Sequence, residues 1–203
     1  MTFRSGFMLV AILLGLLGCS SVSTHYYTLL PAATGNSPKN GEAAPFQLEI
    51  LPVRVPVQVD QPQMVIRQNN GRLAILDNDR WSSALADEFQ SALSDRLEQQ
   101  LGIRNLSGLP RDPDKPVMSL RADVRRFESV PGYYALVDMV WNLTLSTSGE
   151  KRRSLNCSSV VRETAGIELN SLVLAHQRAI ESLAQSIAVT ARAWARNPAA
   201  GCP

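Results

Sequence analysis

Three long segments with alternating apolar and polar residues constrain the fold more than any other feature of this chain. They span residues 117–127, 133–147 and 151–164, and the connections between them, ESVPG and SG, are short. Short connections favour antiparallel neighbours, because parallel strands need a long crossover. The sequence therefore predicts an antiparallel sheet in the second half of the chain.

The middle segment indicates how this sheet is used. The apolar positions on one side are Ala135, Val137, Met139, Trp141, Leu143 and Leu145. Asp138, Asn142 and Thr144 fall on the other side. One face of the sheet is therefore expected to be buried and the other to face water.

Two amphipathic helices are expected to cover the buried face. The first is predicted over 79–101, with Asp79 as its N-cap and Gly102 as its terminating residue. The second is predicted over 170–196, and both carry an apolar stripe at helical spacing. The stripes are Trp81, Leu85, Phe89, Leu93, Leu97 and Leu101, then Val173, His176, Ile180, Leu183, Ile187, Ala191 and Trp194.

Shorter strands are predicted before the first helix. HYYTLLP, over 25–31, is typical of a short strand, and the Gly- and Pro-rich stretch 32–45 is typical of a flexible loop. FQLEILPV, over 46–53, alternates. The segment from Val53 to Val59 continues an extended path that Pro52 and Pro56 interrupt, which indicates an edge or bulged strand.

A hairpin is predicted between these strands and the first helix. MVIRQ (64–68) and RLAIL (72–76) flank NNG, and Asn and Gly tolerate the positive φ of a tight hairpin turn. The order of elements is then strands, helix, three strands, helix. It predicts an α+β fold, an antiparallel sheet with two amphipathic helices packed on one face. The length favours a single domain over 46–196, followed by a flexible tail, 197–203.

The N-terminal apolar run FMLVAILLGLL (7–17) is eleven residues long, whereas a membrane-spanning helix needs about 20. Its flanks, with Arg4 before and small residues after, are typical of a secretory signal. LLGC (16–19) resembles a bacterial lipobox, which predicts a lipoprotein signal peptide over 1–18 and a lipid anchor on Cys19. Ser20, where an Asp would mark retention, resembles an outer-membrane address with the domain in the periplasm. The predicted segment 19–45 then carries the lipid, the short first strand and the loop.

Charge and cysteine content narrow the possibilities further. Removing Arg4 with the signal leaves 19 basic against 18 acidic residues, which argues against nucleic-acid binding. Cys157 and Cys202 remain in an oxidising compartment. Two alternatives stay open: the two cysteines pair, or Cys157 is a small apolar strand residue and Cys202 a free thiol.

No catalytic, metal or cofactor site is predicted. The two histidines are His25, beside the tether, and His176, on the apolar side of the second helix, where a lone histidine is more often structural. Asp112 and Asp114 lie between prolines and indicate a turn. The sequence lacks the HExxH, CxxC, GxSxG, P-loop and dinucleotide patterns, so the chain is not expected to be an enzyme.

Four motifs in this order carry a family resemblance: YYTL, LEILPVRVP, MVIRQNNGRLAILDNDRW and DMVWNLTL. Together they resemble the PqiC (YmbA) family over nearly the whole mature chain, Cys19 to about Trp194. The resemblance implies an outer-membrane lipoprotein that serves as auxiliary subunit of an MCE-type lipid transport system. Its implied partners are a periplasm-spanning MCE protein (PqiB-like) and, through it, an inner-membrane component (PqiA-like).

The resemblance implies a docking subunit in which an exposed strand edge or loop receives the MCE protein. Candidate contacts are Tyr26 and Tyr27, beside the membrane, and Val53, Val55 and Val57. The ordinary alternative for the tyrosines is packing and pairing at the sheet edge. A ring-shaped homo-oligomer would suit a ring-shaped conduit.

Two other functions remain open at this point. One is an assembly lipoprotein of a secretion or outer-membrane biogenesis machine, with the same anchor and fold class but a different partner. The other is a periplasmic lipid-binding carrier, which would need a sizeable apolar cavity.

Overall fold

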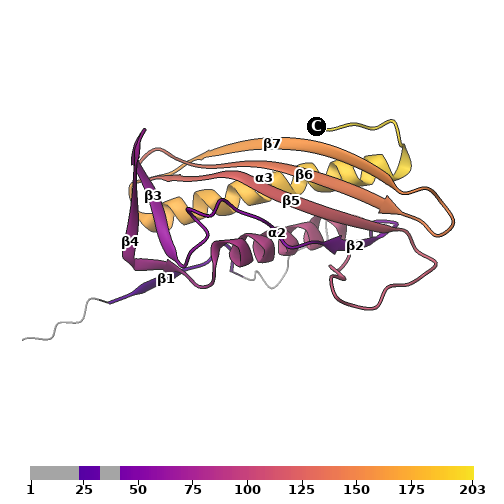
Figure 1. The fold of residues 1–203 in the computed structure, drawn as a ribbon, viewed down its shortest axis with the longest axis horizontal. Helices are drawn as coiled ribbons and strands as arrows, with labels where there is room; N and C mark the ends of the chain where they lie inside the picture. Colours follow the sequence, from indigo (N-terminus) through magenta and orange to yellow (C-terminus); the bar gives the residue numbers. More distant parts are fainter. Residues whose placement is uncertain (1–22, 33–41) are drawn as a thin grey trace, which may run out of the picture.

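A four-stranded sheet runs along the molecule (Figure 1). The structure is a computed structural model that describes residues 23–32 and 42–203. The strands lie in the order β2 (Gln47–Ile50), β5 (Val117–Val130), β6 (Tyr134–Ser146) and β7 (Arg153–Thr164). The three long strands lie where the alternation predicts them, and β5, β6 and β7 pair antiparallel as expected.

The inner face of this sheet is the face predicted from the middle strand. All six apolar residues from Ala135 to Leu145 on that side are at most 6% exposed. Trp141 is the largest of the fully buried side chains. Burying a side chain of this kind contributes roughly 1.5–3 kcal/mol each, so the face supplies much of the driving force for folding.

The sheet is mixed, which corrects the expectation of a purely antiparallel sheet. β2 pairs parallel to β5, with Leu48 opposite Met118. The sequence between β2 and β5 includes a hairpin and a helix, and this length of chain permits the crossover that parallel strands require. The α+β class itself is confirmed.

A second sheet of three strands stands at one end, in the order β1 (His25–Tyr27), β4 (Arg72–Trp81) and β3 (Gln63–Asn69). The predicted β3–β4 hairpin is present, but no described non-glycine residue has positive φ and Gly71 does not either. A register shift next to the turn, between Arg67 and Asn69, accompanies this geometry. β1 pairs parallel to β4, so the folded unit begins at β1 and not at residue 46.

The first helix, α2 (Leu85–Leu101), starts later than predicted. Asp79 is not an N-cap, because β4 continues through it to Trp81 and Ala84 precedes the helix. Trp81 is buried as expected, but it is the last residue of β4 and not part of the helix. Gly102 ends the helix with φ of 67°, as predicted, and its N–H donates to the Glu98 carbonyl.

The second long helix, α3 (Leu169–Arg196), matches its prediction to within one residue. It packs against α2 and along β6 and β7, and Figure 1 shows it following the length of the sheet. Its stripe, including Ile180, Leu183 and Ile187, joins the same hydrophobic core as α2 and the inner face of the sheet.

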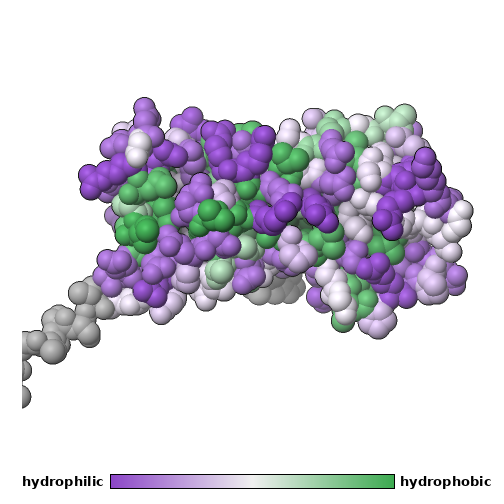
Figure 2. Space-filling model, viewed as in Figure 1, coloured by the Kyte–Doolittle hydropathy of each residue, from purple (hydrophilic) through white to green (hydrophobic). Residues whose placement is uncertain are grey.

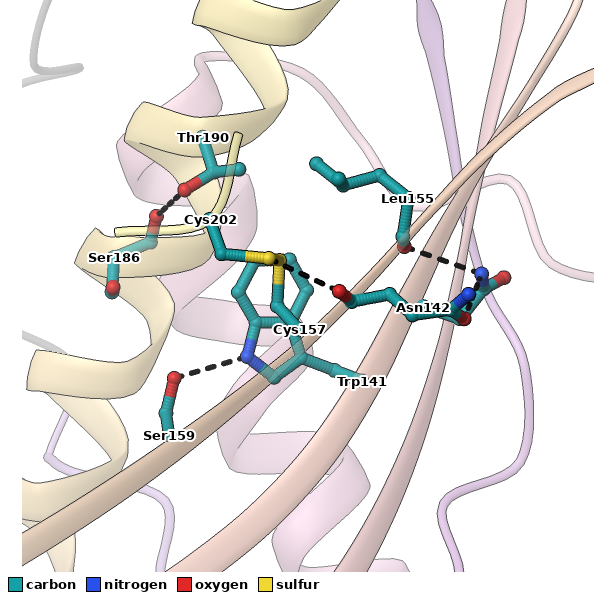
Figure 3. Close-up of a disulfide and its surroundings, with 9 residues drawn as sticks. Trp141, Asn142, Leu155, Cys157, Ser159, Ser186, Thr190 and Cys202 are labelled. Atoms are coloured by element: carbon teal, nitrogen blue, oxygen red, sulfur yellow. Dashed lines mark hydrogen bonds between the residues drawn. A yellow bond between two sulfur atoms is a disulfide. The ribbon is translucent and has the colours of Figure 1, made fainter. Parts of the chain in front are cut away.

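The C-terminal tail is fixed, in contrast to the flexible tail expected over 197–203. Cys157 and Cys202 form a disulfide, with their Cα atoms 5.6 Å apart, that holds the tail against β7 (Figure 3). Ala200 packs on the core, and its N–H donates to the Asn197 carbonyl. The sequence left this pairing open because it contains no measure of the distance between a strand and a tail 45 residues away.

Candidate partner-binding cleft

The outer edge of β5 is covered over only part of its length. After β2, the chain follows β5 as Leu51 N–H donates to the Leu120 carbonyl (2.9 Å) and Val124 N–H donates to the Arg54 carbonyl (2.8 Å). It then leaves the sheet at Pro56, which has no N–H for the ladder. Beyond Val124, no described strand pairs with this edge of β5.

A cleft of about 230 Å³ lies beside the uncovered edge; we name it the edge cleft. It is bounded by the turn after Val55, by the β3–β4 hairpin and by the second half of β5. Its lining residues are Pro56, Gln58, Val59, Val65, Arg67, Leu73, Arg125, Arg126, Phe127, Glu128 and Ser129. The cleft is large enough for one or two side chains of a partner, not for a whole lipid.

Exposed apolar side chains surround the edge cleft. Val57 is 90% exposed and lies between two lining residues. Ile75 is 55% exposed and pairs across the hairpin with Val65, while Leu73 pairs with Arg67. Figure 2 shows hydrophobic residues gathered over this hairpin among hydrophilic ones. Exposed apolar side chains gathered beside a cleft are typical of an interaction site.

Three arginines give the edge cleft a positive character. The guanidinium of Arg67 donates to Glu128 (3.2 Å), and its Nε is buried without a hydrogen-bond partner. Arg125 and Arg126 both bind the carboxylate of Asp138, at 2.7 and 3.2 Å. Three guanidinium groups against two carboxylates leave one positive charge in excess, which favours an acidic group in a ligand. The apolar lining residues, such as Val65 and Leu73, favour apolar side chains.

A β-bulge places these arginines. The register of β5 against β6 shifts between Val124 and Arg126. Val124 is the last inward residue before the shift, and Phe127 is the first after it, so Arg125 is the extra residue. Both arginines therefore reach Asp138 on β6, and the inner face remains apolar.

The sequence analysis missed these arginines. The sequence does contain a signal for the bulge in VRRF (124–127). The apolar residues that face the core have even numbers up to Val124 and odd numbers from Phe127, and the two arginines lie between them. Asp138, predicted to face away from the core, does so, yet it is only 7% exposed because the two arginines cover it. The sequence alone did not indicate that Asp138 would form ion pairs with arginines of the neighbouring strand.

The structure separates the predicted contact residues. Val53 is buried at 5% exposure and Val55 is half-buried against the core, which leaves Val57 as the only one of the three available to a partner. Tyr26 is 67% exposed but lies on β1, at the opposite edge of the small sheet from β3. It therefore does not line the edge cleft.

Tyr27 packs and pairs at the sheet edge, which was the alternative to a role in partner contact. Its hydroxyl donates to Asp79 (3.2 Å), and its carbonyl accepts the Ser82 N–H (2.8 Å). Burial and the neighbouring Asp79 raise the pKa of Tyr27 above its usual value. The side chain thus packs and pairs at the sheet edge.

The buried histidine has a structural role. His176 Nε2 lies 2.9 Å from Ser129 Oγ, and its ring stacks on Phe127 at 3.9 Å between centroids. Burial lowers its pKa to about 3, so the ring is neutral at physiological pH. Its Nδ1 has no partner, so no carboxylate orients the ring as in a catalytic triad. Among residues 23–32 and 42–203, no group of three or more His, Cys, Asp and Glu could hold a metal ion.

Comparison with known proteins decides the family. The sequence profile of the ABC-type transport auxiliary lipoprotein component matches residues 27–188, from the last residue of β1 into α3. The chain belongs to this family. The auxiliary lipoproteins include PqiC-like proteins, so the resemblance drawn from the motifs is confirmed at this level. They are components of transport and not a catalytic family.

Two solved structures share the fold of this auxiliary lipoprotein. An uncharacterized protein, 15% identical, aligns with a TM-score of 0.59 over 83% of this chain and 98% of its own. A protein from Xanthomonas campestris, 17% identical, aligns with a TM-score of 0.56 over 78% of this chain and 91% of its own. No curated protein matches the sequence. In the part of the chain that the structure describes, no helix combines the length and apolarity needed to cross a bilayer.

Proposed function

We propose that this auxiliary lipoprotein is a non-catalytic docking subunit of an MCE-type lipid transport system. Its lipid anchor, on Cys19, holds it at the outer membrane with the domain in the periplasm. The edge cleft receives an apolar or acidic segment of a periplasm-spanning MCE protein, PqiB-like, that connects to a PqiA-like inner-membrane component. The subunit thereby supports envelope integrity by joining the conduit to the outer membrane.

The edge cleft is the observation that carries the proposal. It combines an unpaired strand edge with an excess of positive charge, and the exposed residue Val57 lies in the chain between two of its lining residues. Unpaired N–H and C=O groups can bind an extended segment, and exposed apolar side chains supply contact area that a monomer leaves unused. A homo-oligomeric ring would present several such clefts to one conduit.

The anchor and its address lie outside the described residues. Cys19 precedes β1 by six residues, a length of at most about 20 Å when extended. The β3–β4 hairpin lines the edge cleft. Figure 1 places this hairpin, in the same small sheet as β1, at the end of the fold that carries β1. A partner in the cleft would therefore be held close to the membrane.

The lipid-carrier alternative has less support. The space between helices and sheet, where acyl chains would lie, is filled by fully buried side chains such as Phe89, Met139 and Trp141. An assembly lipoprotein of another envelope machine would have the same anchor and could use the same cleft. The identity of the partner therefore distinguishes it.

Affinity purification of the full-length lipidated protein from crosslinked membranes tests the proposal. We expect an MCE protein to be recovered with the wild type and lost with Val57→Glu, because a carboxylate beside the cleft would repel an acidic segment and would be costly to bury against an apolar one. Val189→Glu is the matched control, because Val189 is 63% exposed on α3 and does not line the cleft. Recovery of secretion or outer-membrane assembly components, without an MCE protein, would contradict the proposal. Equal loss of the MCE protein with both variants would show that the edge cleft is not its binding site.

A further inference from the structure

Two turns form a joint surface at the end of the molecule that carries β1. The β5–β6 turn and the segment between β7 and α3 are connected by hydrogen bonds from Gly132 N–H to the Gly166 carbonyl (2.9 Å) and from Ala165 N–H to the Tyr133 carbonyl (3.2 Å). A Cβ added to Gly132 would lie 3.3 Å from Cγ1 of Ile167. The Ile167 side chain therefore lies over the neighbouring turn and not over the core.

Large apolar side chains are exposed on this surface. Tyr133 is 72% exposed and Ile167 is 80% exposed, whereas Ala135 and Ala165 beside them are buried. Leu174, 45% exposed, lies in the second turn of α3, the helix that follows this segment. We name the surface formed by Tyr133, Ile167 and Leu174 the apolar end. It is not part of the edge cleft, which none of the three lines.

The apolar end is close to the point where the tether enters the fold. Figure 1 places β1, the β5–β6 turn and the start of α3 at one end of the molecule. Burial, Asp79 and then the charge of Glu168 raise the pKa of Tyr27, which is consistent with Glu168, next to Ile167, lying near β1. Only five residues lie between Cys19 and β1, so a lipid on Cys19 would keep this end within about 20 Å of the bilayer.

We infer that the apolar end contacts the bilayer into which the lipids on Cys19 insert. This inference rests on the lipid anchor of the proposed function and goes beyond it, because it assigns a second membrane contact made by the folded domain. A tyrosine at this depth suits the interface, since its ring is apolar and its hydroxyl stays among the headgroups. Ile167 would lie at the boundary of the acyl chains, and Glu168 beside it would remain in the hydrated headgroup layer.

Such a contact would give the subunit a defined orientation. A single tether would let the domain rotate. A tether and a second contact at the same end would instead hold the long axis of the sheet away from the membrane. The disulfide-bonded tail would then point into the periplasm. The edge cleft would keep a constant height above the bilayer, and a docked partner would find it in one geometry.

Fluorescence of the lipidated full-length protein in vesicles tests the inference. The variant Tyr133→Trp is reconstituted into phosphatidylcholine and phosphatidylethanolamine vesicles with brominated acyl chains, after flotation has shown that the protein is anchored. The native tryptophans 81, 141 and 194 are at most 4% exposed and provide a constant background. We expect the emission added by Y133W to shift to shorter wavelength and most of it to be quenched by the bromines.

The matched control is Val189→Trp, on α3 about 30 Å from the start of the helix at 1.5 Å per residue. Its added emission should stay at the wavelength of water-exposed tryptophan and remain unquenched. Ile167→Trp is a second probe if Y133W folds poorly by circular dichroism. A floating protein in which Y133W and I167W stay unquenched, or in which V189W is quenched equally, would overturn the inference and leave the anchor standing. Failure to float would refute the anchor on Cys19 and this inference with it.

Discussion

Glu88 connects the N-terminal strand to the helical layer. It is 4% exposed on α2, and one carboxylate oxygen accepts hydrogen bonds from Thr28 Oγ1 and Leu29 N–H, both at 2.8 Å. The other oxygen accepts from Ser82 and Ser83. From the sequence, Glu88 was only one of two adjacent acids on a helix, because its partners are far away along the chain or belong to the preceding turn.

Replacement of Glu88 should loosen β1. Glu88→Ala leaves the buried Leu29 N–H and the Thr28 hydroxyl without an acceptor, so we expect a loss of about 2–4 kcal/mol in the free energy of unfolding. Urea denaturation measures the loss, and limited proteolysis should show earlier cleavage near Thr28. Asp87→Ala is the control, since Asp87 is exposed and also lies in the first turn of α2. Equal losses for the two variants would show that the network does not hold β1.

His176 makes stability depend on pH. Its folded pKa of about 3 lies below the usual unfolded value of 6.5, so the unfolded state binds the proton more tightly. The stabilisation is complete above pH 6.5 and is lost as the pH falls from 6.5 towards 3. Between pH 7.5 and 4.5 this single group accounts for a loss of about 2–3 kcal/mol.

His176→Gln should remove most of that pH dependence, because glutamine can still reach Ser129 but does not titrate. Its stability at pH 7.5 can fall through altered packing on Phe127, so the measured quantity is the difference between pH 7.5 and 4.5 in urea denaturation. The wild type should lose more than the variant by about 2–3 kcal/mol. An equal decline in both proteins would mean that other groups cause the acid sensitivity.

At the scale of elements, the periodicity of β5 predicts the strand but not its bulge. Its alternation predicts a strand with one buried face, and this is confirmed up to Val124. The bulge then shifts the pattern by one residue and produces the arginine pair of the edge cleft. Local alternation cannot report a bulge directly, because an extra residue is defined only against the partner strand.

The C-terminal element is held by its disulfide. Cross-linking residues 45 apart restricts the unfolded chain, which corresponds to about 4 kcal/mol in the loop-entropy estimate. We expect reduction with dithiothreitol to lower the free energy of unfolding by up to this amount and to make the chain after Arg196 susceptible to proteases.

Cys202→Ser supplies the control for that experiment. It should be less stable than the oxidised wild type by a similar amount and should not respond to the reductant. A reductant effect of the same size in the variant would show that the disulfide is not its target. Unchanged stability in both would indicate that packing of Ala200 alone holds the tail.

At the scale of the whole molecule, the proposed location depends on a single residue after the anchor. By resemblance to lipoprotein sorting, we expect Ser20 to direct the protein to the outer membrane. Ser20→Asp should therefore move most of the lipidated protein to inner-membrane fractions in a sucrose gradient. It should do so without altering the stability of the fold, because residue 20 precedes β1.

Persistence of the Ser20→Asp protein in the outer-membrane fraction would contradict the sorting assignment. The Cys19→Ala variant, expected to lack the lipid, separates loss of sorting from loss of anchoring. A correctly sorted wild type and a misplaced variant would also give two membranes in which to compare recovery of the MCE protein.

Elements with a clear local pattern were predictable from the sequence alone. The long strands β6 and β7, the hairpin, α3 and the glycine that ends α2 follow from periodicity and turn chemistry over neighbouring residues. The class of the chain, an auxiliary lipoprotein, followed from motifs in a given order. These features require no knowledge of which segments meet.

Which segments become neighbours depends on tertiary packing. The parallel pairings of β1 with β4 and of β2 with β5, the Glu88 network and the bond between Cys157 and Cys202 all join residues far apart in sequence. The edge cleft depends on two such segments, the turn after Val55 and the β3–β4 hairpin, and on the stretch of β5 with which no described strand pairs on that side. Periodicity reports which face of an element is buried, whereas a site between elements depends on the packing that brings them together.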